Sequence, residues 1–387
     1  MLSLFVLAGT MLCGGCGSAG GLTIAPMATS AQTAVAPVVT TTAAQNGAVI
    51  ASLASTTNGA TIYYTLDGST PTASSQVYEA PFLVASNLTV KAIAVADGYT
   101  TSVVTTQAFT PNIPSGTLVW SDEFSGTAGM THTQPNPATW SYDTGANCCG
   151  NNEQETYCAW GSNTAPCSAE NPNAWIGTDG YLHIEARQST AGAPAYTSAR
   201  LKSAGLLSFM YGRIEARMQL PESQGMWPAF WALGNNIATV RWPASGELDI
   251  MEHIDGNNPP PYVGGKQPGY DWIAGSIHGG TSGKNEGNGS VRYHAAGFSA
   301  ADWHTYGMIW TKGKIQYYID DPSNTYASFN TSDLVYNDGS VAPWPFDMGP
   351  EFLILNLAVG GSWPGNADST TVLPSNMLVD YVRVYAP

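Results

Sequence analysis

Between residues 34 and 110, short runs of alternating apolar and polar residues are separated by turn-forming residues. The segment TVKAIAVA alternates with the period of two that is typical of a half-buried strand. The segments DGSTP and ADGY contain the Asp-Gly pairs that favour tight turns. A segment of this length and pattern predicts a small immunoglobulin-like β-sandwich.

The strand-like pattern continues from residue 118 to residue 387. Runs such as GRIEARMQL, KIQYYID and FLILNLAVG have this character, and we find no amphipathic helix of three turns. Strands without a covering layer of helices must close on themselves or stack as two sheets. We therefore expect an all-β protein with a large two-sheet sandwich at 118–387, joined to the smaller domain by a linker at 111–117.

The first 33 residues differ from the rest of the chain. Residues 1–16 contain an apolar stretch that is too short to span a bilayer and is followed by small residues, as in an export signal without its basic start. Cys16 follows two glycines and resembles a bacterial lipoprotein acceptor. Residues 17–33 are free of charge and predict a flexible tether. We expect an exported protein, either extracellular or anchored to the cell surface by a lipid on Cys16.

Charged residues are scarce throughout the chain and acidic residues dominate among them. Only 11% of the residues are charged, against about a quarter in an average protein, and the net charge is −15. Such a surface repels nucleic acids and anionic membranes, so a neutral or cationic partner fits better. The chain has 12 Trp and 19 Tyr, whose ring faces can pack on a sugar ring, although most of these rings will fill cores. The composition therefore favours a carbohydrate partner.

Four of the six cysteines are close together, at positions 148, 149, 158 and 167. In an exported chain, an even local cluster of cysteines predicts two disulfides that staple a loop. A zinc site is the alternative, but the spacing does not give two separated C-x-x-C pairs. We expect disulfides, and the sequence leaves their pairing open.

The segment SGELDIMEH places Glu247, Asp249 and Glu252 in an otherwise apolar run. Burying like charges together raises their pKa values, which is costly unless function uses it. The run has no helix start signal, so we predict a strand, in which Glu247 and Asp249 share a face. Strict alternation would put Glu252 on the other face. One extra residue in a β-bulge around Ile250–Met251 would return it, and the sequence thus predicts three carboxylates on one face.

This arrangement suits the hydrolysis of a glycoside with retention of configuration. One carboxylate attacks the anomeric carbon while a second, ~5–5.5 Å away, protonates the departing oxygen. We assign Glu247 as the nucleophile and Glu252 as the general acid/base, with Asp249 orienting the nucleophile and helping to keep the acid protonated. The alternative is a Ca²⁺ site, but such loops are rich in Asp, Asn and Gly rather than in Leu, Ile and Met.

The run ELDIME resembles the E-x-D-x-x-E signature of glycoside hydrolase family 16, the jelly-roll β-glucanases. Other branches of the family have the shorter signature E-x-D-x-E. The one additional residue in ELDIME is that of the bulged, laminarinase-like branch. Further matching segments follow in order: VWSDEFSG, GNNEQETYC, GMWPAFWALG, HTYGMIW, NLAVGGSWPGN and LVDYVRVY. The resemblance covers 118–387 and implies a jelly-roll β-sandwich with a concave substrate cleft. Residues 34–110 resemble the small β-sandwich module at the C-terminus of chitobiases, which indicates a fold but no ligand.

The resemblance also suggests which residues bind the substrate. Trp227 and Trp231 are four apart on a predicted strand, so they share a face that would line the cleft. His278 would lie near the reaction centre and donate to a sugar hydroxyl or to the acid/base. His253 should point away from the cleft. The other candidates are Arg200, Asn152 and Glu153 for sugar hydroxyls, and Trp242 and Trp363 for stacking on glucose.

Many members of this family hold one structural Ca²⁺ on the convex face. The matching positions here are Glu123, Gly180 and Asp380, and two of the three contacts would be backbone oxygens, the Gly carbonyl among them. This ion would pin the two ends of the domain together. The histidines lack the spacing of a zinc site, so we expect no cofactor in catalysis.

Together these features predict an exported, monomeric bacterial enzyme without a transmembrane helix. We expect a retaining endo-β-1,3-glucanase that acts on laminarin-like β-glucans. One alternative is a mixed-linkage β-1,3-1,4-glucanase or a galactan-directed relative. An alternative of another class is a non-catalytic β-glucan-binding protein, although a binding protein has no need of a paired acid and nucleophile.

Overall fold

The computed structural model describes residues 32–146, 148–189, 194–254, 272–281 and 286–387. The predicted export signal at 1–16, with Cys16, and nearly all of the tether at 17–33 lie outside the described residues. Among the helices in the described part of the chain, none has the length and apolar character needed to cross a membrane.

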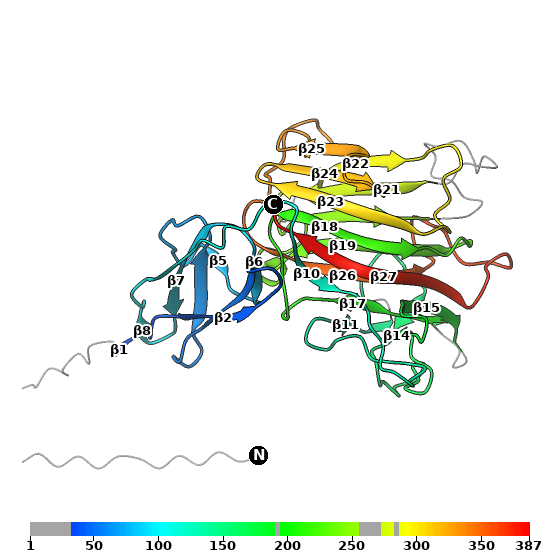
Figure 1. The fold of residues 1–387 in the computed structure, drawn as a ribbon, viewed down its shortest axis with the longest axis horizontal. Coiled ribbons are helices and arrows are strands. Elements are labelled where there is room, and N and C mark those ends of the chain that lie inside the picture. Colours follow the sequence, from blue (N-terminus) through cyan, green and yellow to red (C-terminus); the bar gives the residue numbers. More distant parts are fainter. Residues whose placement is uncertain (1–31, 147, 190–193, 255–271, 282–285) are drawn as a thin grey trace, which may run out of the picture.

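The N-terminal module is a small β-sandwich, as predicted (Figure 1). A three-stranded sheet, β2-β3-β6, and a four-stranded sheet, β5-β4-β7-β9, enclose a core that includes Ile62, Phe82 and Val90, and β1 pairs with β8. Tyr64 is also buried in this core. The strands are β1 (Gln32–Thr33), β2 (Val38–Ala43), β3 (Val49–Ala54), β4 (Thr61–Thr65), β5 (Gln76–Val77), β6 (Phe82–Val84), β7 (Leu88–Val95), β8 (Tyr99–Thr100) and β9 (Thr105–Phe109).

The larger domain consists of two sheets, in agreement with the predicted β-sandwich. One sheet has the order β12-β13-β16-β15-β27-β18-β23-β24-β25, with β10 on β27 and β14 on β15. Its strands are β10 (Leu118–Asp122), β12 (Gly145–Ala146), β13 (Glu155–Tyr157), β14 (Ala174–Ile176), β15 (Leu182–Gln188), β16 (Tyr196–Ser198), β18 (Gly212–Gln219), β23 (His304–Thr311), β24 (Lys314–Ile319), β25 (Thr325–Asn330) and β27 (Ser375–Tyr385).

The second sheet carries the predicted acidic strand near its middle. Its order is β11-β17-β26-β19-β20-β21-β22. Its strands are β11 (Ser141–Asp143), β17 (Arg200–Lys202), β19 (Met226–Gly234), β20 (Glu247–Glu252), β21 (Ile273–Gly279), β22 (Gly287–Tyr293) and β26 (Glu351–Val359). The single helix of the described residues, α1 (Ile237–Val240), has four residues.

The core between the two sheets is built from the apolar half of each alternating strand. Phe230 and Leu248 of the seven-stranded sheet and Met308, Trp310 and Tyr317 of the other sheet belong to one buried cluster. Because every second residue of a strand enters this core, the remaining residues of β19 and β20 are left to face outward. The two-sheet core therefore fixes which side chains can line a cleft.

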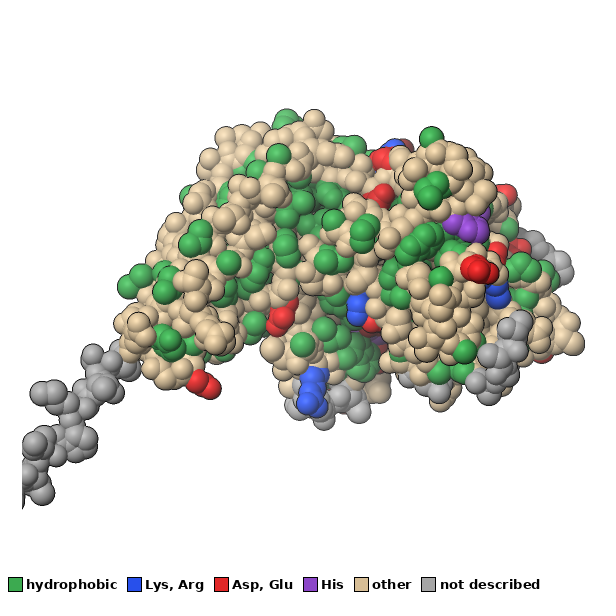
Figure 2. Space-filling view, turned by 90° about the horizontal axis from the view of Figure 1, so that it is seen from below, with side chains coloured by type: hydrophobic (Ala, Val, Ile, Leu, Met, Phe, Trp, Pro, Cys, Tyr) green, Lys and Arg blue, Asp and Glu red, His purple; other side chains and the backbone are tan. Residues whose placement is uncertain are grey.

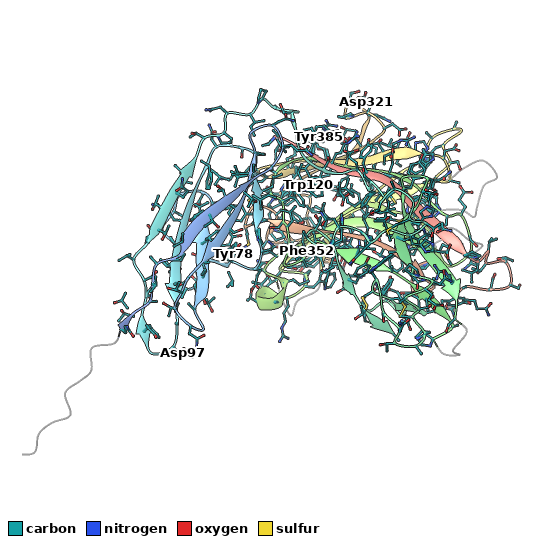
Figure 3. The ribbon with its side chains drawn as sticks, turned by 60° about the horizontal axis from the view of Figure 1, so that its bottom comes forward. Tyr78, Asp97, Trp120, Asp321, Phe352 and Tyr385 are labelled. Carbon is teal, nitrogen blue, oxygen red and sulfur yellow. A yellow bond between two sulfur atoms is a disulfide. The ribbon has the colours of Figure 1, made fainter. Side chains whose placement is uncertain are left out.

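The module is joined to the larger domain by direct contacts as well as by the connecting segment (Figures 1 and 3). Leu83 N donates to Ser208 O (3.0 Å), Ser208 N donates to Pro81 O (2.9 Å), and Leu83 is buried in the core cluster of the larger domain. On the same side, Asn46 Nδ2 donates to Leu118 O (2.7 Å). The predicted linker at 111–117 is also packed, since its Gly116 N donates to the Ala386 carbonyl. The two units are thus docked, and the linker is not a free tether.

The surface reflects the scarcity of charge in the sequence. On the face shown in Figure 2, acidic and basic side chains occur in small, scattered groups among apolar and uncharged polar side chains. A surface of this kind suits a neutral partner better than a highly charged one.

Candidate active site

A cavity of about 380 Å³ lies over the outward face of the seven-stranded sheet. Its walls come from β17, β19, β20 and β26, together with the loop that precedes β13. Its charged and aromatic lining residues, all predicted from the sequence, are Glu153, Arg200, Trp227, Trp231, Trp242, Glu247, Asp249 and Glu252. One cavity therefore holds the acidic cluster beside aromatic rings, as a sugar site requires.

The three carboxylates share the cavity because β20 contains the predicted β-bulge. Against β19, Trp231 pairs with Asp249 and Phe230 with Met251, so Ile250 is the inserted residue. Ile250 and Met251 both point into the core, and Glu252 returns to the face of Asp249. The bulge also shifts the pairing with β21 at this point.

A glycine on β21 makes room beside the bulge. A side chain at Gly275 would place its Cβ 2.5 Å from the ring of Tyr317 and 2.6 Å from the hydroxyl of Tyr326. Such distances are well inside van der Waals contact, so the close approach of this strand to the tyrosines requires glycine.

The acidic cluster is arranged to hold a proton. Burial, followed by the negative charge of Asp249, raises the pKa of Glu252 well above its usual range. Burial and Asp249 also raise the pKa of Glu247, to about 8, but the positive charges of His278 and Arg200 oppose this rise. Trp227 Nε1 donates to Glu252 Oε1 (3.0 Å) and fixes the orientation of this carboxyl group. The cluster can thus keep Glu252 protonated beside the negative charge of Asp249.

His278 contacts the middle carboxylate, whereas the resemblance placed it against a sugar or the acid/base. Its Nε2 lies 2.9 Å from Asp249 Oδ2, and its Nδ1 contacts the carboxylate of Glu286. Burial alone would lower the pKa of His278, but Asp249 and Glu286 raise it well above its usual range. The two carboxylates therefore favour the protonated form of the imidazole. Ligand atoms of Glu247, Asp249 and His278 also lie within 4.8 Å of one another, so these three side chains could hold a metal ion if His278 were neutral.

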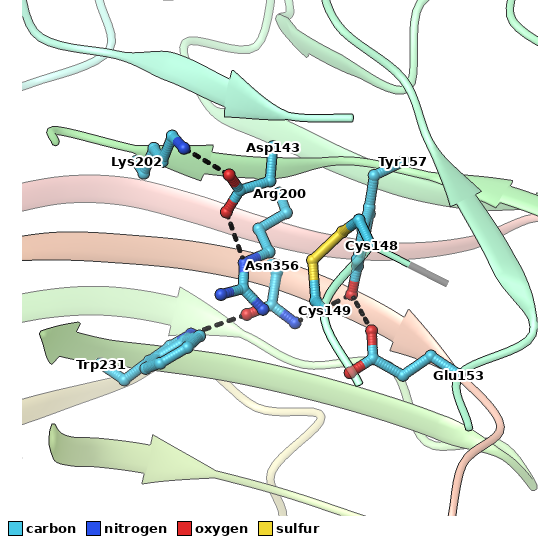
Figure 4. Close-up of a disulfide and its surroundings, with 9 residues drawn as sticks. All are labelled: Asp143, Cys148, Cys149, Glu153, Tyr157, Arg200, Lys202, Trp231 and Asn356. Carbon is cyan, nitrogen blue, oxygen red and sulfur yellow. Dashed lines mark hydrogen bonds and ion pairs between the residues drawn. A yellow bond between two sulfur atoms is a disulfide. The ribbon is translucent and has the colours of Figure 1, made fainter. Parts of the chain in front are cut away.

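The aromatic and basic side chains of the cavity are connected by contacts around Trp231 (Figure 4). The guanidinium of Arg200 lies 4.5 Å from the centroid of the Trp231 ring, and its Nε donates to Asp143 (2.9 Å). Trp231 Nε1 donates to Asn356 Oδ1 (2.8 Å). The Nδ2 of Asn356 in turn donates to Tyr157 Oη (3.3 Å). These contacts hold the indole and the guanidinium rigidly beside the acidic cluster.

Besides His278, two of the predicted substrate-binding residues lie beside the cavity and do not line it. Asn152 is exposed, and its Nδ2 donates to Ser362 Oγ (2.9 Å), so its neighbour Asn151 lines the cavity instead. Trp363 packs edge-on against Trp227, with the ring centroids 5.4 Å apart. Its direct role is to support Trp227.

Several residues of the site were not predicted from the sequence. Asn356 lies in an apolar run, FLILNLAVG, and a single polar residue in such a run is a signal that could have identified it. Glu286 and Cys149 have no such signal. His253, by contrast, is buried away from the cavity with its Nδ1 2.7 Å from the Trp272 carbonyl, as expected.

The side chains of both acidic residues predicted at the calcium site form ion pairs with arginines. Arg383 donates to both oxygens of Glu123 (2.9 and 2.8 Å), and Arg217 donates to Asp380 (2.7 Å). Gly180 lies in the turn before β15 with φ +82°. A Ca²⁺ ion would compete with the guanidinium groups for these side-chain oxygens but not for backbone oxygens, so the calcium site stays a prediction.

The predicted disulfides form between near neighbours. Cys158 pairs with Cys167, and Cys148 pairs with the adjacent Cys149 (Figure 4). Cys158–Cys167 therefore staples a loop, whereas Cys148–Cys149 joins consecutive residues.

The fold and the acidic cluster together indicate a glycoside hydrolase. The chain belongs to family 16 of the glycosyl hydrolases, whose model matches residues 154–383. The model of the Fn3-associated family matches residues 52–109, within the N-terminal module.

Related proteins agree with this assignment. The chain is 37% identical to a β-glucanase of Rhodothermus marinus over 280 residues, which is 70% of this chain and 86% of that protein. Two solved structures are similar at a TM-score of 0.55: the laminarinase catalytic domain of Thermotoga maritima MSB8 (33% identity, 71% of this chain, 99% of that one) and the endo-β-1,3-glucanase of Pyrococcus furiosus (35%, 70% and 94%). Three other curated relatives are longer, and this chain spans 34%, 38% and 54% of them.

The substitution Asp249→Asn should move the alkaline limb of the pH profile of kcat to lower pH, by about one unit. The negative charge of Asp249 raises the pKa of Glu252, so without this charge the acid loses its proton at lower pH. The measurement is kcat on a soluble β-glucan across the pH range. As a matched control, His278→Gln removes a charge that lowers the pKa of Glu252, so it should move the same limb to higher pH. An alkaline limb that stays in place in both variants, or that moves in the same direction in both, would contradict this electrostatic account.

Proposed function

We propose that the protein is a retaining endo-β-1,3-glucanase that hydrolyses laminarin-like β-glucans. The observation that carries the proposal is the bulged strand β20, which presents Glu247, Asp249 and Glu252 to one cavity. The names of the similar proteins, a β-glucanase, a laminarinase and an endo-β-1,3-glucanase, support the class of substrate. A neutral glucan also suits an acidic protein of low charge density.

In the first step, Glu247 attacks the anomeric carbon and Glu252 gives its proton to the departing glycosidic oxygen. The raised pKa of Glu252 keeps that proton available near neutral pH. Asp249 is paired with His278, and its carboxylate has an oxygen within 4.8 Å of one of Glu247, close enough to help orient the nucleophile. The product of this step is a glycosyl ester on Glu247 and a shortened glucan.

In the second step, Glu252, now ionised, takes a proton from a water molecule that attacks the anomeric carbon of the ester. The bond to Glu247 breaks, its carboxylate is regenerated, and Glu252 is protonated again. Two inversions at the same carbon give net retention. Trp227 Nε1 can donate to Glu252 through both steps, because that hydrogen bond is compatible with either protonation state of the carboxyl group.

A non-catalytic β-glucan-binding protein would need the aromatic cavity but not the acidic cluster. Three buried or half-buried carboxylates reduce affinity for a neutral ligand unless chemistry uses them, because each must be desolvated. The enzyme is therefore the better account. Export of the chain, with a lipid on Cys16, belongs to the same proposal and is supported by the composition of residues 1–16 alone.

Product analysis on laminarin, lichenan, agarose and xyloglucan in parallel tests the substrate class. We expect soluble oligosaccharides from laminarin, with a rapid fall in viscosity that indicates internal cleavage. In ¹H NMR, the β-anomer should appear first and then mutarotate. Preferred cleavage of lichenan or agarose would replace the proposed substrate, and a first-formed α-anomer would contradict retention.

A further inference from the structure

The disulfide between the adjacent residues Cys148 and Cys149 is located at the mouth of the candidate active site. These residues lie in the loop between β12 and β13, which pair as antiparallel neighbours. Cys149 lines the same cavity as Trp231 and Glu247, and Cys148 is exposed at the rim. Figure 4 shows the bond beside Arg200, Asn356 and Glu153.

This disulfide cannot act as a staple of the fold. It joins residues one apart in sequence, so it closes no loop of chain and removes little conformational freedom from the unfolded state. Cys158–Cys167, with a sequence separation of nine, does close a loop. The role of Cys148–Cys149 must therefore be local, in the shape and chemistry of the surface that it forms.

The loop that carries the disulfide is held in place by other contacts. Gln154 N donates to Val359 O (2.8 Å), Ser362 N donates to Asn151 O (2.7 Å), and Tyr157 Oη donates to Glu153 (3.0 Å). Because these hydrogen bonds do not involve either cysteine, the loop stays attached to the sheet when the S–S bond opens. What changes is the part of the wall formed by residues 148 and 149.

We propose that the Cys148–Cys149 disulfide forms one wall of a sugar subsite. Reduction of this disulfide should weaken substrate binding without changing the chemical step. The inference rests on the proposed function and extends it. Two bonded sulfur atoms offer a polarisable apolar surface that can contact the C–H face of a glucose ring, while Arg200 and Glu153 address its hydroxyl groups. Two free thiols on a more flexible pair of residues present this surface less well.

The reductive step is an ordinary exchange with a dithiol such as dithiothreitol. A thiolate of the dithiol attacks one sulfur of the pair, the Cys148–Cys149 bond breaks, and a mixed disulfide forms. The second thiol of the reagent then displaces the protein sulfur and the reagent leaves as a cyclic disulfide. Two electrons and two protons end on Cys148 and Cys149 as thiols. The exposure of Cys148 gives the reagent access, whereas Cys158 is buried.

The test compares the wild type with the double variants C148S/C149S and C158S/C167S on laminarihexaose, with and without dithiothreitol. We expect C148S/C149S to raise KM about five-fold at unchanged kcat, which corresponds to the loss of one modest contact. Reduced wild type should behave in the same way, and C148S/C149S should not respond to the reagent. C158S/C167S should lose thermal stability and keep the response of KM to reduction.

The redox state of the Cys148–Cys149 disulfide is measured separately by alkylation and mass spectrometry. Cys148 and Cys149 should resist alkylation in untreated protein and become labelled after mild reduction. Labelling without reductant, an unchanged KM in C148S/C149S, or a fall in kcat equal to the rise in KM would overturn the inference. Wild-type protein that neither hydrolyses nor binds laminarihexaose would contradict the proposed function instead. The alkylation pattern would still decide whether the Cys148–Cys149 disulfide exists.

Discussion

The substitution Glu247→Gln is expected to lower kcat on laminarin by about 10⁴-fold. Glutamine has nearly the same shape as glutamate, so it keeps the packing of β20, but its amide cannot form a glycosyl ester. Affinity for the substrate should persist, because Trp231 and Arg200 are untouched. The measurement is the rate of reducing-sugar release, together with binding of laminarihexaose by calorimetry.

Glu351 offers a matched control for this experiment. It is another buried carboxyl group of the same sheet, 2% exposed, and it does not line the cavity. Burial, with the charges of Glu247 and Asp249, raises the pKa of Glu351 well above its usual range, so it carries a proton and Gln mimics it. Glu351→Gln should therefore keep kcat within about two-fold. Equal losses in the two variants would mean that Glu247 acts only through folding.

The substitution Glu252→Ala is expected to give a loss that depends on the leaving group. On laminarin, where the departing alcohol needs a proton, kcat should fall by about 10³-fold. A dinitrophenyl β-glucoside or β-laminaribioside leaves as a stable anion and needs no protonation, so its glycosylation step should lose far less. The measurement is kcat/KM for laminarin and for the aryl glycoside in parallel.

Added azide separates the roles of the two glutamates. In Glu252→Ala, azide should attack the ester on Glu247 without the help of a base and give a β-glycosyl azide. In Glu247→Gly, azide can occupy the place of the missing nucleophile and give an α-glycosyl azide. Identical losses on both substrates in Glu252→Ala, or an α-azide from that variant, would reverse the assignment.

Features that follow from strand periodicity could be predicted from the sequence. A strand has two faces, so the spacing of Trp227 and Trp231 placed both on one side, and the structure confirms this. The same rule, applied to the spacing of Asp249 and Glu252, required an inserted residue, and Ile250 is that residue. These predictions succeeded because a buried sheet tolerates only one orientation of each strand.

Features that depend on contacts between distant segments could not be predicted in this way. Glu286 reaches His278 across the pairing of β21 with β22, and no local pattern marks it. Asn152 and Asn151 are equivalent in sequence, but Asn151 lines the cavity and the side chain of Asn152 donates to Ser362 Oγ instead. Likewise, the module packs on the larger domain because Leu83 enters the core of that domain, and the sequence of the linker gives no sign of this contact.

The central claim, that β20 presents a nucleophile and a separate acid to one sugar linkage, is tested most directly by trapping the ester. A 2-deoxy-2-fluoro β-laminaribioside with a dinitrophenyl leaving group should label the protein once, since the fluorine slows both steps and the activated leaving group speeds up only the first. Peptide mass spectrometry should then locate the adduct on Glu247. An adduct on Asp249 or Glu252 would contradict the account, as would unlabelled protein that releases an inverted product.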